Sequence, residues 1–221
     1  MTDALTIGGR RTRPSKILCV ARNYADHAKE MGVPVPEEPV FFLKPTTALL
    51  PGGGTILLPP ESKQVEVETE LAVVLGHRGR DITLATAMNF VQGYAVFFDI
   101  TARDLQAKAR KEGSPWTQSK AYDTFAPISD GVPAASVPNP HNLRIRLRVN
   151  DVVRQDSNTR QMVFSIPELL VAVSRIMTLE RGDILATGTP SGVCPIVPGD
   201  VLVGEIEGVG VLTCTAAPRK R

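Results

Sequence analysis

The chain contains little of what marks disulfide-rich proteins or thiolate metal sites. It has only three cysteines in 221 residues, Cys19, Cys194 and Cys214, and no two of them form a Cys-x-x-Cys pair. An odd number of widely spaced cysteines argues against a disulfide framework and against a thiolate metal site. We therefore expect free thiols and a cytoplasmic location.

Long apolar runs, nucleotide-binding motifs and an excess of charge are also missing. No apolar stretch approaches the roughly 20 residues of a membrane span, and the first residues lack the apolar core of a secretory signal. No Gly-x-Gly-x-x-Gly or Gly-Lys-Ser/Thr motif opens a helix, which disfavours nucleotide binding. The net charge is only +2. We expect neither a membrane nor a nucleic acid as a partner.

One basic pattern needs a separate explanation. Arg144, Arg146 and Arg148 alternate with apolar residues along residues 143–149, so they share one face of a predicted strand. No other basic or aromatic cluster supports nucleic-acid binding. A solvated face or a subunit contact explains the stripe better. After this strand, Asn150-Asp151 before Val152-Val153 predicts a hairpin turn.

What the chain does contain is a dense series of strand patterns. With 43% hydrophobic residues it can bury the core of one domain. Alternating or β-branched runs predict strands at residues 16–21, 41–44, 65–75, 93–100, 143–149, 184–187, 200–206 and 209–215. Helical spacing predicts helices at residues 23–31, 83–91, 101–112 and 165–177, and residues 113–120 predict a loop. The pattern is that of a strand-rich α+β fold.

Two of the predicted helices carry an apolar stripe that we expect to face the core. The stripe of helix 83–91 consists of Leu84, Ala87, Met88 and Val91. The stripe of helix 165–177 consists of Leu169, Leu170, Val173 and Ile176. The second helix opens with Ser165-Ile166-Pro167-Glu168, a capping box with proline in the first turn.

The predicted strand at residues 65–75 begins with a row of carboxylates. A strand sends alternate side chains to opposite faces, so Glu66, Glu68 and Glu70 share one face. Neighbouring members lie roughly 6 to 7 Å apart by the rise per residue, and they would repel one another at the start of an apolar run. On burial statistics alone such a row is a solvated strand edge. The alternative is that a divalent cation offsets the repulsion.

A second acid fits the same site. Residues 93–100 form an apolar, aromatic run whose only charge, Asp99, lies where a helical pattern begins. Two glutamates and an aspartate make an all-oxygen ligand set suited to Mg²⁺ or Mn²⁺, whereas zinc more often recruits His or Cys. We therefore predict a metal site formed by Glu68, Glu70 and Asp99.

Candidate groups for acid–base chemistry and substrate binding lie in the helical patterns. His27 and Glu30 lie three residues apart on one face of a helix, where the carboxylate can orient the imidazole as a general base; a solvated surface pair is the alternative. Arg103 and Gln106 follow the last predicted metal ligand, and both can bond a carboxylate or carbonyl oxygen of a ligand. For Arg103 the alternative is an ion pair with Asp104 or another acid.

Several spaced blocks form a pattern that runs through most of the chain. They are residues 21–30, Phe42-Leu43-Lys44-Pro45, Glu68-Thr69-Glu70-Leu71, Gly93-Tyr94, residues 99–104, Pro115-Trp116 with Lys120, Gly182-Asp183 and Thr187-Gly188-Thr189-Pro190. Together they resemble the fumarylacetoacetate hydrolase family over residues 16–215, and most closely its short-form acylpyruvase and oxaloacetate decarboxylase members. The resemblance implies a catalytic domain over these residues with the mixed β-roll of the family's C-terminal domain, and a homodimer. Residues 1–15 would then be an N-terminal arm or short strand, and residues 216–221 a C-terminal tail.

The resemblance also implies roles for single residues. In similar proteins the counterpart of Lys120 reaches the substrate, where its charge can stabilise an enolate. The counterpart of Thr189 contacts the ligand. The His27/Glu30 pair would act as a catalytic dyad on a segment that orders over the metal when ligand binds. With Arg103 and Gln106, we expect Arg22 and Thr189 to bind the substrate.

Two positions depart from the family pattern. Glu66 adds a carboxylate beside the predicted ligand pair and is a candidate for a supporting group around it. Cys194 stands where many relatives have glycine, which would alter the loop after Thr189.

Together these features predict a metal-dependent hydrolase of acylpyruvates. It would cleave a carbon–carbon bond of a small 2-oxo acid to give pyruvate and a carboxylate, with oxaloacetate decarboxylation as a related activity. His27, held by Glu30, would activate the water. One alternative is an isomerase, decarboxylase or hydratase of 2-oxo-enedioates or 2-oxo-pentenoates, because the same enolate serves each reaction. The other is a non-catalytic binding protein that kept the fold.

Overall fold

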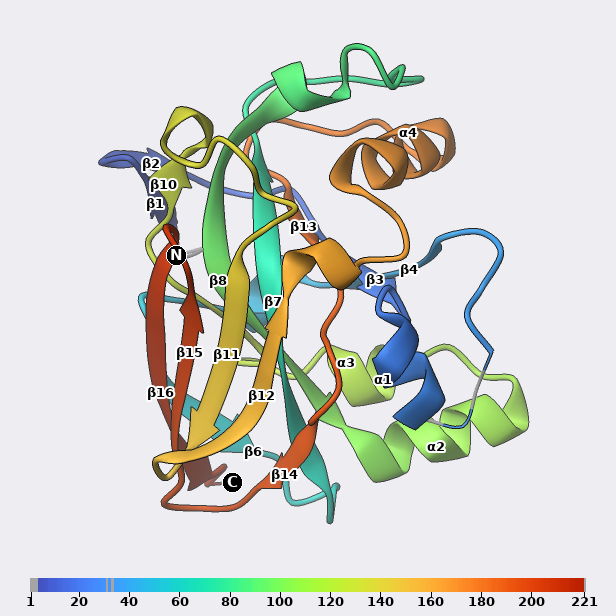
Figure 1. The fold of residues 1–221 in the computed structure, drawn as a ribbon. Coiled ribbons are helices and arrows are strands. Elements are labelled where there is room, and N and C mark those ends of the chain that lie inside the picture. Colours follow the sequence, from blue (N-terminus) through green and yellow to red (C-terminus); the bar gives the residue numbers. More distant parts are fainter. Residues whose placement is uncertain (1–3, 31, 33, 221) are drawn as a thin grey trace.

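The computed structural model describes residues 4–30, 32 and 34–220. Its strands form two large sheets and a small hairpin (Figure 1). The nine-stranded sheet consists of β3 (Ile17–Ala21), β4 (Val40–Lys44), β5 (Leu49–Pro51), β7 (Val65–Leu75), β8 (Val91–Ala102), β9 (Ala126–Ile128), β10 (Val132–Pro133), β13 (Ile184–Ala186) and β14 (Cys194–Ile196). The five-stranded sheet consists of β6 (Gly54–Leu58), β11 (Arg144–Val149), β12 (Val152–Asn158), β15 (Val201–Ile206) and β16 (Gly210–Pro218). Strands β1 (Leu5–Ile7) and β2 (Arg10–Thr12) form the hairpin.

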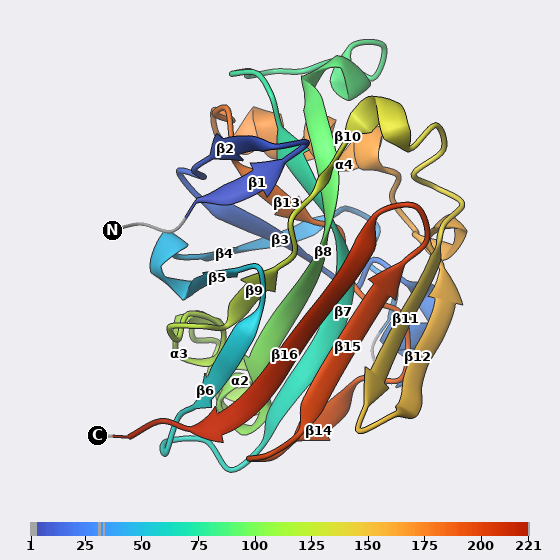
Figure 2. The same ribbon diagram turned by 90° about the vertical axis from the view of Figure 1, so that its left-hand side faces the viewer.

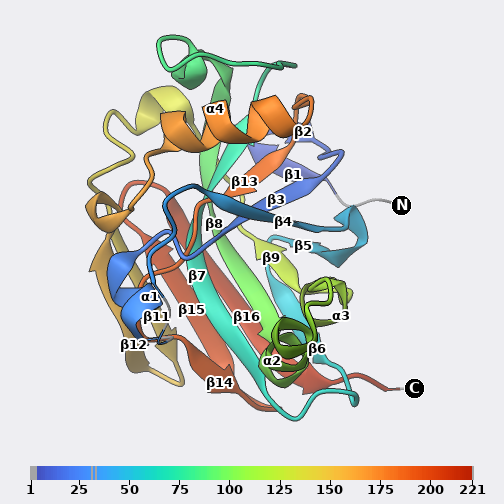
Figure 3. The same ribbon diagram turned by 90° about the vertical axis from the view of Figure 1, so that its right-hand side faces the viewer.

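Four short α-helices lie on the side of β7 and β8 away from the five-stranded sheet (Figures 1 and 3). They are α1 (Ala25–Glu30), α2 (Arg103–Glu112), α3 (Thr117–Lys120) and α4 (Ile166–Ile176). Single 3₁₀ turns occur at Thr46–Ala48, Ala87–Phe90, Ala134–Ser136 and Thr159–Gln161. Among the described residues, none of the helices combines the length and the apolar character that crossing a membrane requires.

Strands β7 and β8 form the centre of the molecule, and the five-stranded sheet packs across one of their faces (Figure 2). On that face Leu71 and Phe98 join Leu147 in the larger hydrophobic core. A Cβ atom on Gly204 would lie 2.4 Å from the Phe98 ring, so glycine allows β15 to approach this closely. The opposite face carries a smaller core that includes Ala72 together with Cys19 of β3 and Ala186 of β13, strands that continue the same sheet.

The alternation of β7 places the acidic row on that second face. Glu68 and Glu70 precede Ala72 by an even number of residues, so they point the same way as Ala72 while Leu71 points into the larger core. In the antiparallel register Glu68 is paired directly with Asp99 of β8. The carboxylates therefore lie on one face of the central pair of strands, beneath helices α1, α2 and α3.

Much of the predicted architecture is confirmed. The fold is a strand-rich α+β roll in which the predicted strands are present. The capping box of Ser165 and Glu168 begins α4. Asn150 and Asp151 have φ values of 50° and 65°, as a two-residue hairpin turn requires, between β11 and β12. The three cysteines are free and buried.

The predicted helix at residues 83–91 is wrong, whereas the predicted apolar stripe of α4 is confirmed except at its last residue. Residues 83–91 form no α-helix: only a 3₁₀ turn occurs, and Leu84 and Met88 are 60% and 37% exposed. The hydroxyl groups of Thr83 and Thr86 bond one another at 2.9 Å, and the Thr86 hydroxyl also donates to the Thr83 carbonyl, local bonds that compete with a helix. Ile176, the last residue of α4, is 61% exposed.

Other boundaries also differ from the expectation. Residues 117–120, expected in a loop, form α3. Strand β16 continues to Pro218 and pairs with β6, so residues 216–218 belong to the sheet and not to a tail. Within the expected N-terminal arm, residues 5–12 form the β1–β2 hairpin. The predictions for residues 1–3, 31 and 221 lie outside the described residues.

Candidate metal centre and active site

The structure brings the three predicted metal ligands together. Glu68, Glu70 and Asp99 each offer a carboxylate oxygen within 4.8 Å of the others. The three residues are only 6%, 1% and 1% exposed. Buried carboxylates this close to one another repel unless positive charge is supplied.

Basic side chains supply part of that charge. The Lys120 ammonium donates to Asp99 Oδ2 at 2.5 Å and lies 3.5 Å from Glu68 Oε2. The Arg103 guanidinium pairs with Glu68, and Lys44 lies 2.7 Å from Asp99 Oδ1. Although burial raises the pKa of Glu68, the charges of Lys120 and Arg103 hold it well below its usual range. Glu68 is therefore ionised and ready to bind a cation.

Glu70 is the member of the cluster that lacks a basic partner. Among the described residues it forms no ion pair, and its Oε2 accepts one backbone hydrogen bond, from Gly188 N–H at 2.8 Å. Burial raises the pKa of Glu70 well above its ordinary value, and the nearby charges of Asp99 and Glu68 raise it further. A cation bound between the three carboxylates would offset the free-energy cost of keeping Glu70 ionised in this buried position. The all-oxygen donor set fits Mg²⁺ or Mn²⁺.

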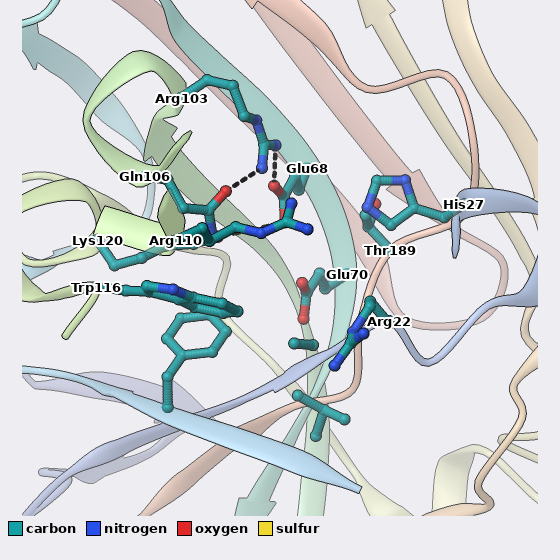
Figure 4. Close-up of a pocket in the computed structure, with 13 residues that line it drawn as sticks. Arg22, His27, Glu68, Glu70, Arg103, Gln106, Arg110, Trp116, Lys120 and Thr189 are labelled. Carbon is teal, nitrogen blue, oxygen red and sulfur yellow. Dashed lines mark hydrogen bonds and ion pairs between the residues drawn. The ribbon is translucent and has the colours of Figure 1, made fainter. Parts of the chain in front are cut away.

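A cavity of about 120 Å³ opens beside the carboxylates (Figure 4). It is lined by Val20, Ala21, Arg22, His27, Phe42, Glu68, Glu70, Arg103, Gln106, Arg110, Trp116, Lys120 and Thr189. All of the predicted site residues except Glu30 and Asp99 thus reach one small space. Its wall combines two carboxylates with four basic side chains, so it suits an anionic ligand bound next to a cation.

His27 and Glu30 form the predicted pair on α1. The His27 Nδ1 and Glu30 Oε2 atoms are 3.2 Å apart, and His27 is only 7% exposed. Glu30 also accepts hydrogen bonds of 3.1 and 3.2 Å from Gly192 N–H. Because Glu30 engages Nδ1, the nitrogen left for a ligand is Nε2. The carboxylate both orients the ring and ties α1 to the loop after β13.

Arg103 and Gln106, predicted to bind substrate, are bonded within the protein. Arg103 donates to Glu66 at 2.6 Å and to the Gln106 side-chain oxygen at 2.5 Å, and it also pairs with Glu68. The ion-pair alternative considered for Arg103 is therefore present, with Glu66 and Glu68 as its partners. Asp104 instead accepts from the Ser62 hydroxyl at 2.6 Å.

Thr189 lines the cavity, but its hydroxyl is already bonded. It donates to the Thr69 carbonyl and accepts from Gln155 Nε2, both at 2.8 Å. Gln155 in turn accepts from Thr69 N–H at 3.0 Å. The two residues fix the loop against β7, and this brings the neighbouring Gly188 N–H to Glu70.

Arg22 reaches the cavity from a strained backbone. Its φ is 59°, a left-handed conformation that is uncommon for a residue with a Cβ atom. The next residue, fully buried Asn23, holds this geometry, because its amide donates to the Thr187 and Phe164 carbonyls at 2.8 and 3.1 Å. Such strain persists where the surroundings fix it, commonly at a functional site.

Several residues of the site were not predicted. Lys44 belongs to one of the family-like sequence blocks but had no predicted role, and the structure shows it as a buried ion-pair partner of Asp99. Its signal was a lysine ending an otherwise apolar strand, since lysine is seldom fully buried. Arg110 lies in line with Arg103 and Gln106 along α2, and that helical spacing was its signal. Nothing in the sequence placed Phe42 and Trp116 in the cavity wall, where their rings lie 5.6 Å apart.

Comparison with known families agrees with this geometry. The family profile described as Fumarylacetoacetate (FAA) hydrolase C-terminal matches residues 16–217. The chain belongs to the fumarylacetoacetate hydrolase family. The predicted resemblance is confirmed.

Relatives within the fumarylacetoacetate hydrolase family include two proteins named for oxaloacetate. The mitochondrial oxaloacetate tautomerase of Bos taurus is 49% identical over 193 residues, which are 87% of each chain. The mitochondrial oxaloacetate decarboxylase of Dictyostelium discoideum is 48% identical over 195 residues, 88% of this chain and 89% of that protein.

A solved structure of the same family carries ligands. The fumarylpyruvate hydrolase of Pseudomonas aeruginosa, crystallised with Mn²⁺ and pyruvate, superposes with a TM-score of 0.93 and is 38% identical. The match covers 99% of this chain and 97% of the other. Reactions with different names thus occur on closely similar chains.

Proposed function

We propose that the protein is a Mg²⁺- or Mn²⁺-dependent enzyme that acts on oxaloacetate. The reaction would be interconversion of its keto and enol forms or loss of the carboxylate next to the reacting carbon. Hydrolysis of acylpyruvates is the second candidate activity. The proposal rests on the three clustered carboxylates, two of which line a small cavity together with two arginines that form no ion pair among the described residues.

Those arginines are Arg22 and Arg110. Both line the cavity, and among the described residues neither forms an ion pair. Arginine binds a carboxylate through two parallel hydrogen bonds. Two free guanidinium groups in so small a space suit a short substrate with two carboxylates, and oxaloacetate is such a 2-oxo acid. The identity of 48 to 49% to proteins named for oxaloacetate supports this choice.

The chemistry common to these reactions is formation of an enolate. A bound Mg²⁺ or Mn²⁺ would supply positive charge beside the 2-oxo group of the substrate. The Lys120 ammonium, 2% exposed, is placed to offset charge that develops on the enolate oxygen. Arg22 and Arg110 would fix the two ends of the substrate and so align the bond that changes.

For tautomerisation, His27 is the residue that moves the proton. Its Nε2 would take a proton from the carbon between the two carbonyl groups, and the enolate oxygen would then be protonated to give the enol. Glu30 stabilises the imidazolium in between. In decarboxylation the electrons of the breaking carbon–carbon bond remain as the enolate while CO₂ leaves. That reaction therefore needs no base.

Acylpyruvate hydrolysis is supported by the same dyad. His27 would remove a proton from water, the resulting hydroxide would add to the distal carbonyl, and pyruvate would leave as its enolate. The similarity to a fumarylpyruvate hydrolase also supports this activity. The three reactions thus differ in how much they depend on His27.

We also propose a homodimer, as the family resemblance implies. Light scattering coupled to gel filtration measures the mass directly, and the chain mass is 23.8 kDa. A monomer over the concentration range used for activity would contradict this proposal.

The test of function compares substrates and metals. The protein is stripped with EDTA, resupplied with Mg²⁺ or Mn²⁺, and assayed with enol-oxaloacetate, keto-oxaloacetate and acetylpyruvate by ultraviolet absorbance. Metal-dependent turnover of oxaloacetate is expected, and it should be absent in Glu70→Gln. The variant His27→Asn should lose tautomerisation and acylpyruvate hydrolysis while it retains decarboxylation. Turnover of acetylpyruvate without any effect on oxaloacetate would overturn the first choice in favour of the second.

A further inference from the structure

Glu66 stands next to the acidic cluster but does not line the cavity. It lies on β7 on the same face as Glu68, and its side chain is 12% exposed. One of its oxygens accepts from Gln64 Nε2 at 2.7 Å and the other from Arg103 Nε at 2.6 Å. The carboxylate is thus held on both sides and is not a free surface group.

This contact gives the Nε atom of the Arg103 guanidinium an acceptor. All three of its nitrogens have an acceptor: Nε donates to Glu66, Nη1 donates to Gln106, and Nη2 donates to Glu68. A guanidinium binds a carboxylate in bidentate fashion only when two neighbouring donors are free. With Glu66 in place, the side of the Arg103 guanidinium formed by Nε and Nη2 is occupied by two protein carboxylates.

We propose that Glu66 is a positioning and specificity-determining residue. It holds the Arg103 guanidinium against β7, with Nε and Nη2 bonded to Glu66 and Glu68, and so leaves recognition of the substrate carboxylates mainly to Arg22 and Arg110. Its negative charge also adds to the potential that attracts the divalent cation. The inference rests on the proposed function for the identity of the substrate, but not for the effect on the cation.

Loss of Glu66 should change the affinity for the cation and the affinity for the substrate in opposite directions. Without its charge, the Arg103 guanidinium has only Glu68 as an anionic partner, so it competes more strongly with a cation for that carboxylate. The free Nε of Arg103 and the lost negative charge would also favour an anionic substrate. Removing Glu66 should therefore weaken cation binding and strengthen binding of the 2-oxo acid. A role confined to folding would weaken both.

The experiment uses Glu66→Gln, which keeps the size of the side chain. Isothermal titration with MnCl₂ in the absence of substrate is expected to give a Kd about fivefold higher than that of the unmodified protein, the scale of a partly screened charge contact. At saturating Mn²⁺, the KM for oxaloacetate is expected to fall by a similar factor. A variant with Glu66→Gln and Arg103→Gln together should lose the fall in KM, since the effect on substrate acts through Arg103.

Controls separate this role from others. Glu205→Gln removes an exposed carboxylate on the outer sheet and should leave both constants unchanged. An unchanged Kd for Mn²⁺ together with an unchanged KM would overturn the inference, as would a rise in both with a lower urea midpoint. If oxaloacetate is not turned over at all, the proposed function fails, while the Mn²⁺ titration still decides whether Glu66 supports the cation site.

Discussion

The Lys44 ammonium lies 2.7 Å from Asp99 Oδ1, and both residues are only 1% exposed. The same nitrogen donates to the carbonyl groups of Ile100 and Lys120, at 2.9 and 2.7 Å. One buried ammonium group therefore holds a predicted metal ligand, the strand that carries it and the end of α3. It links the part of the site on β8 to the part on the helices.

Lys44→Met should destabilise the fold. Breaking a buried ion pair by removing one partner costs about 3 to 5 kcal/mol, because the other charge stays buried without compensation. Lys120 still pairs with Asp99, so we expect the low end of that range in urea unfolding without metal. Exposed Lys108→Met is the matched control and should change stability by less than about 0.5 kcal/mol. A similar loss in both variants would contradict the role of Lys44.

Arg22→Gln and Arg110→Gln should each raise the KM for oxaloacetate. A hydrogen bond to a charged group contributes about 1.5 to 3 kcal/mol, so a rise of roughly tenfold or more is expected. The KM for acetylpyruvate, which has one carboxylate, should rise for only one of the two variants. Steady-state kinetics at saturating Mn²⁺ measures both, with exposed Arg160→Gln as the control. Unchanged KM values in both variants would remove the argument for a dicarboxylate.

His141 should make stability depend on pH. Its Nε2 accepts from Ile166 N–H at 3.0 Å at the start of α4, and burial lowers the pKa of His141 from its ordinary value of 6.5, although the Glu168 carboxylate opposes this. The folded protein thus binds this proton less readily than the unfolded chain. The stability that depends on neutral His141 is present above pH 6.5 and is lost as the pH falls through the lowered pKa.

The measurement compares the unmodified protein with His141→Gln, whose amide oxygen accepts the same bond without titrating. Urea midpoints are taken between about pH 7.5 and pH 5. The midpoint of the unmodified protein should fall further than that of the variant, since other titrating groups are common to both. Parallel curves would show that His141 does not contribute.

Asp151→Gly should stabilise the β11–β12 hairpin. Asp151 has a φ of 65°, which costs a residue with a Cβ atom roughly 1 kcal/mol and glycine almost nothing. We expect a gain of about 0.5 to 1 kcal/mol in urea unfolding. Asn150→Gly is the contrasting variant, because the Asn150 side chain bonds Asp200 at 2.7 Å and Val201 N–H at 2.9 Å. A loss of stability with Asp151→Gly would contradict the strain argument.

Features that depend on local residue spacing could be predicted from the sequence, and contacts between residues far apart in the chain could not. The alternation of residues along β7 assigned Glu68 and Glu70 to one face. The single charge in the next apolar run, Asp99, indicated the third carboxylate, which lies on the neighbouring strand β8. The prediction of a helix at residues 83–91 was wrong because it rested on apolar spacing alone. The hydroxyl groups of Thr83 and Thr86 form local hydrogen bonds there that compete with a helix. The partners of Arg103 could not be read either, since helical spacing gives its direction but not which acid lies across from it.

The sequence by itself determined the strand-rich fold, the hairpin turn at Asn150 and Asp151, and the residue types of a candidate oxygen-only metal site, because these follow from local spacing and side-chain chemistry. Only the tertiary structure decided how charge is distributed in the site. It paired Lys44 with Asp99, gave Arg103 to Glu66 and Glu68, and left Glu70, Arg22 and Arg110 without ionic partners among the described residues. Those pairings join residues far apart in the chain, and they depend on strand order and burial, which no local pattern contains.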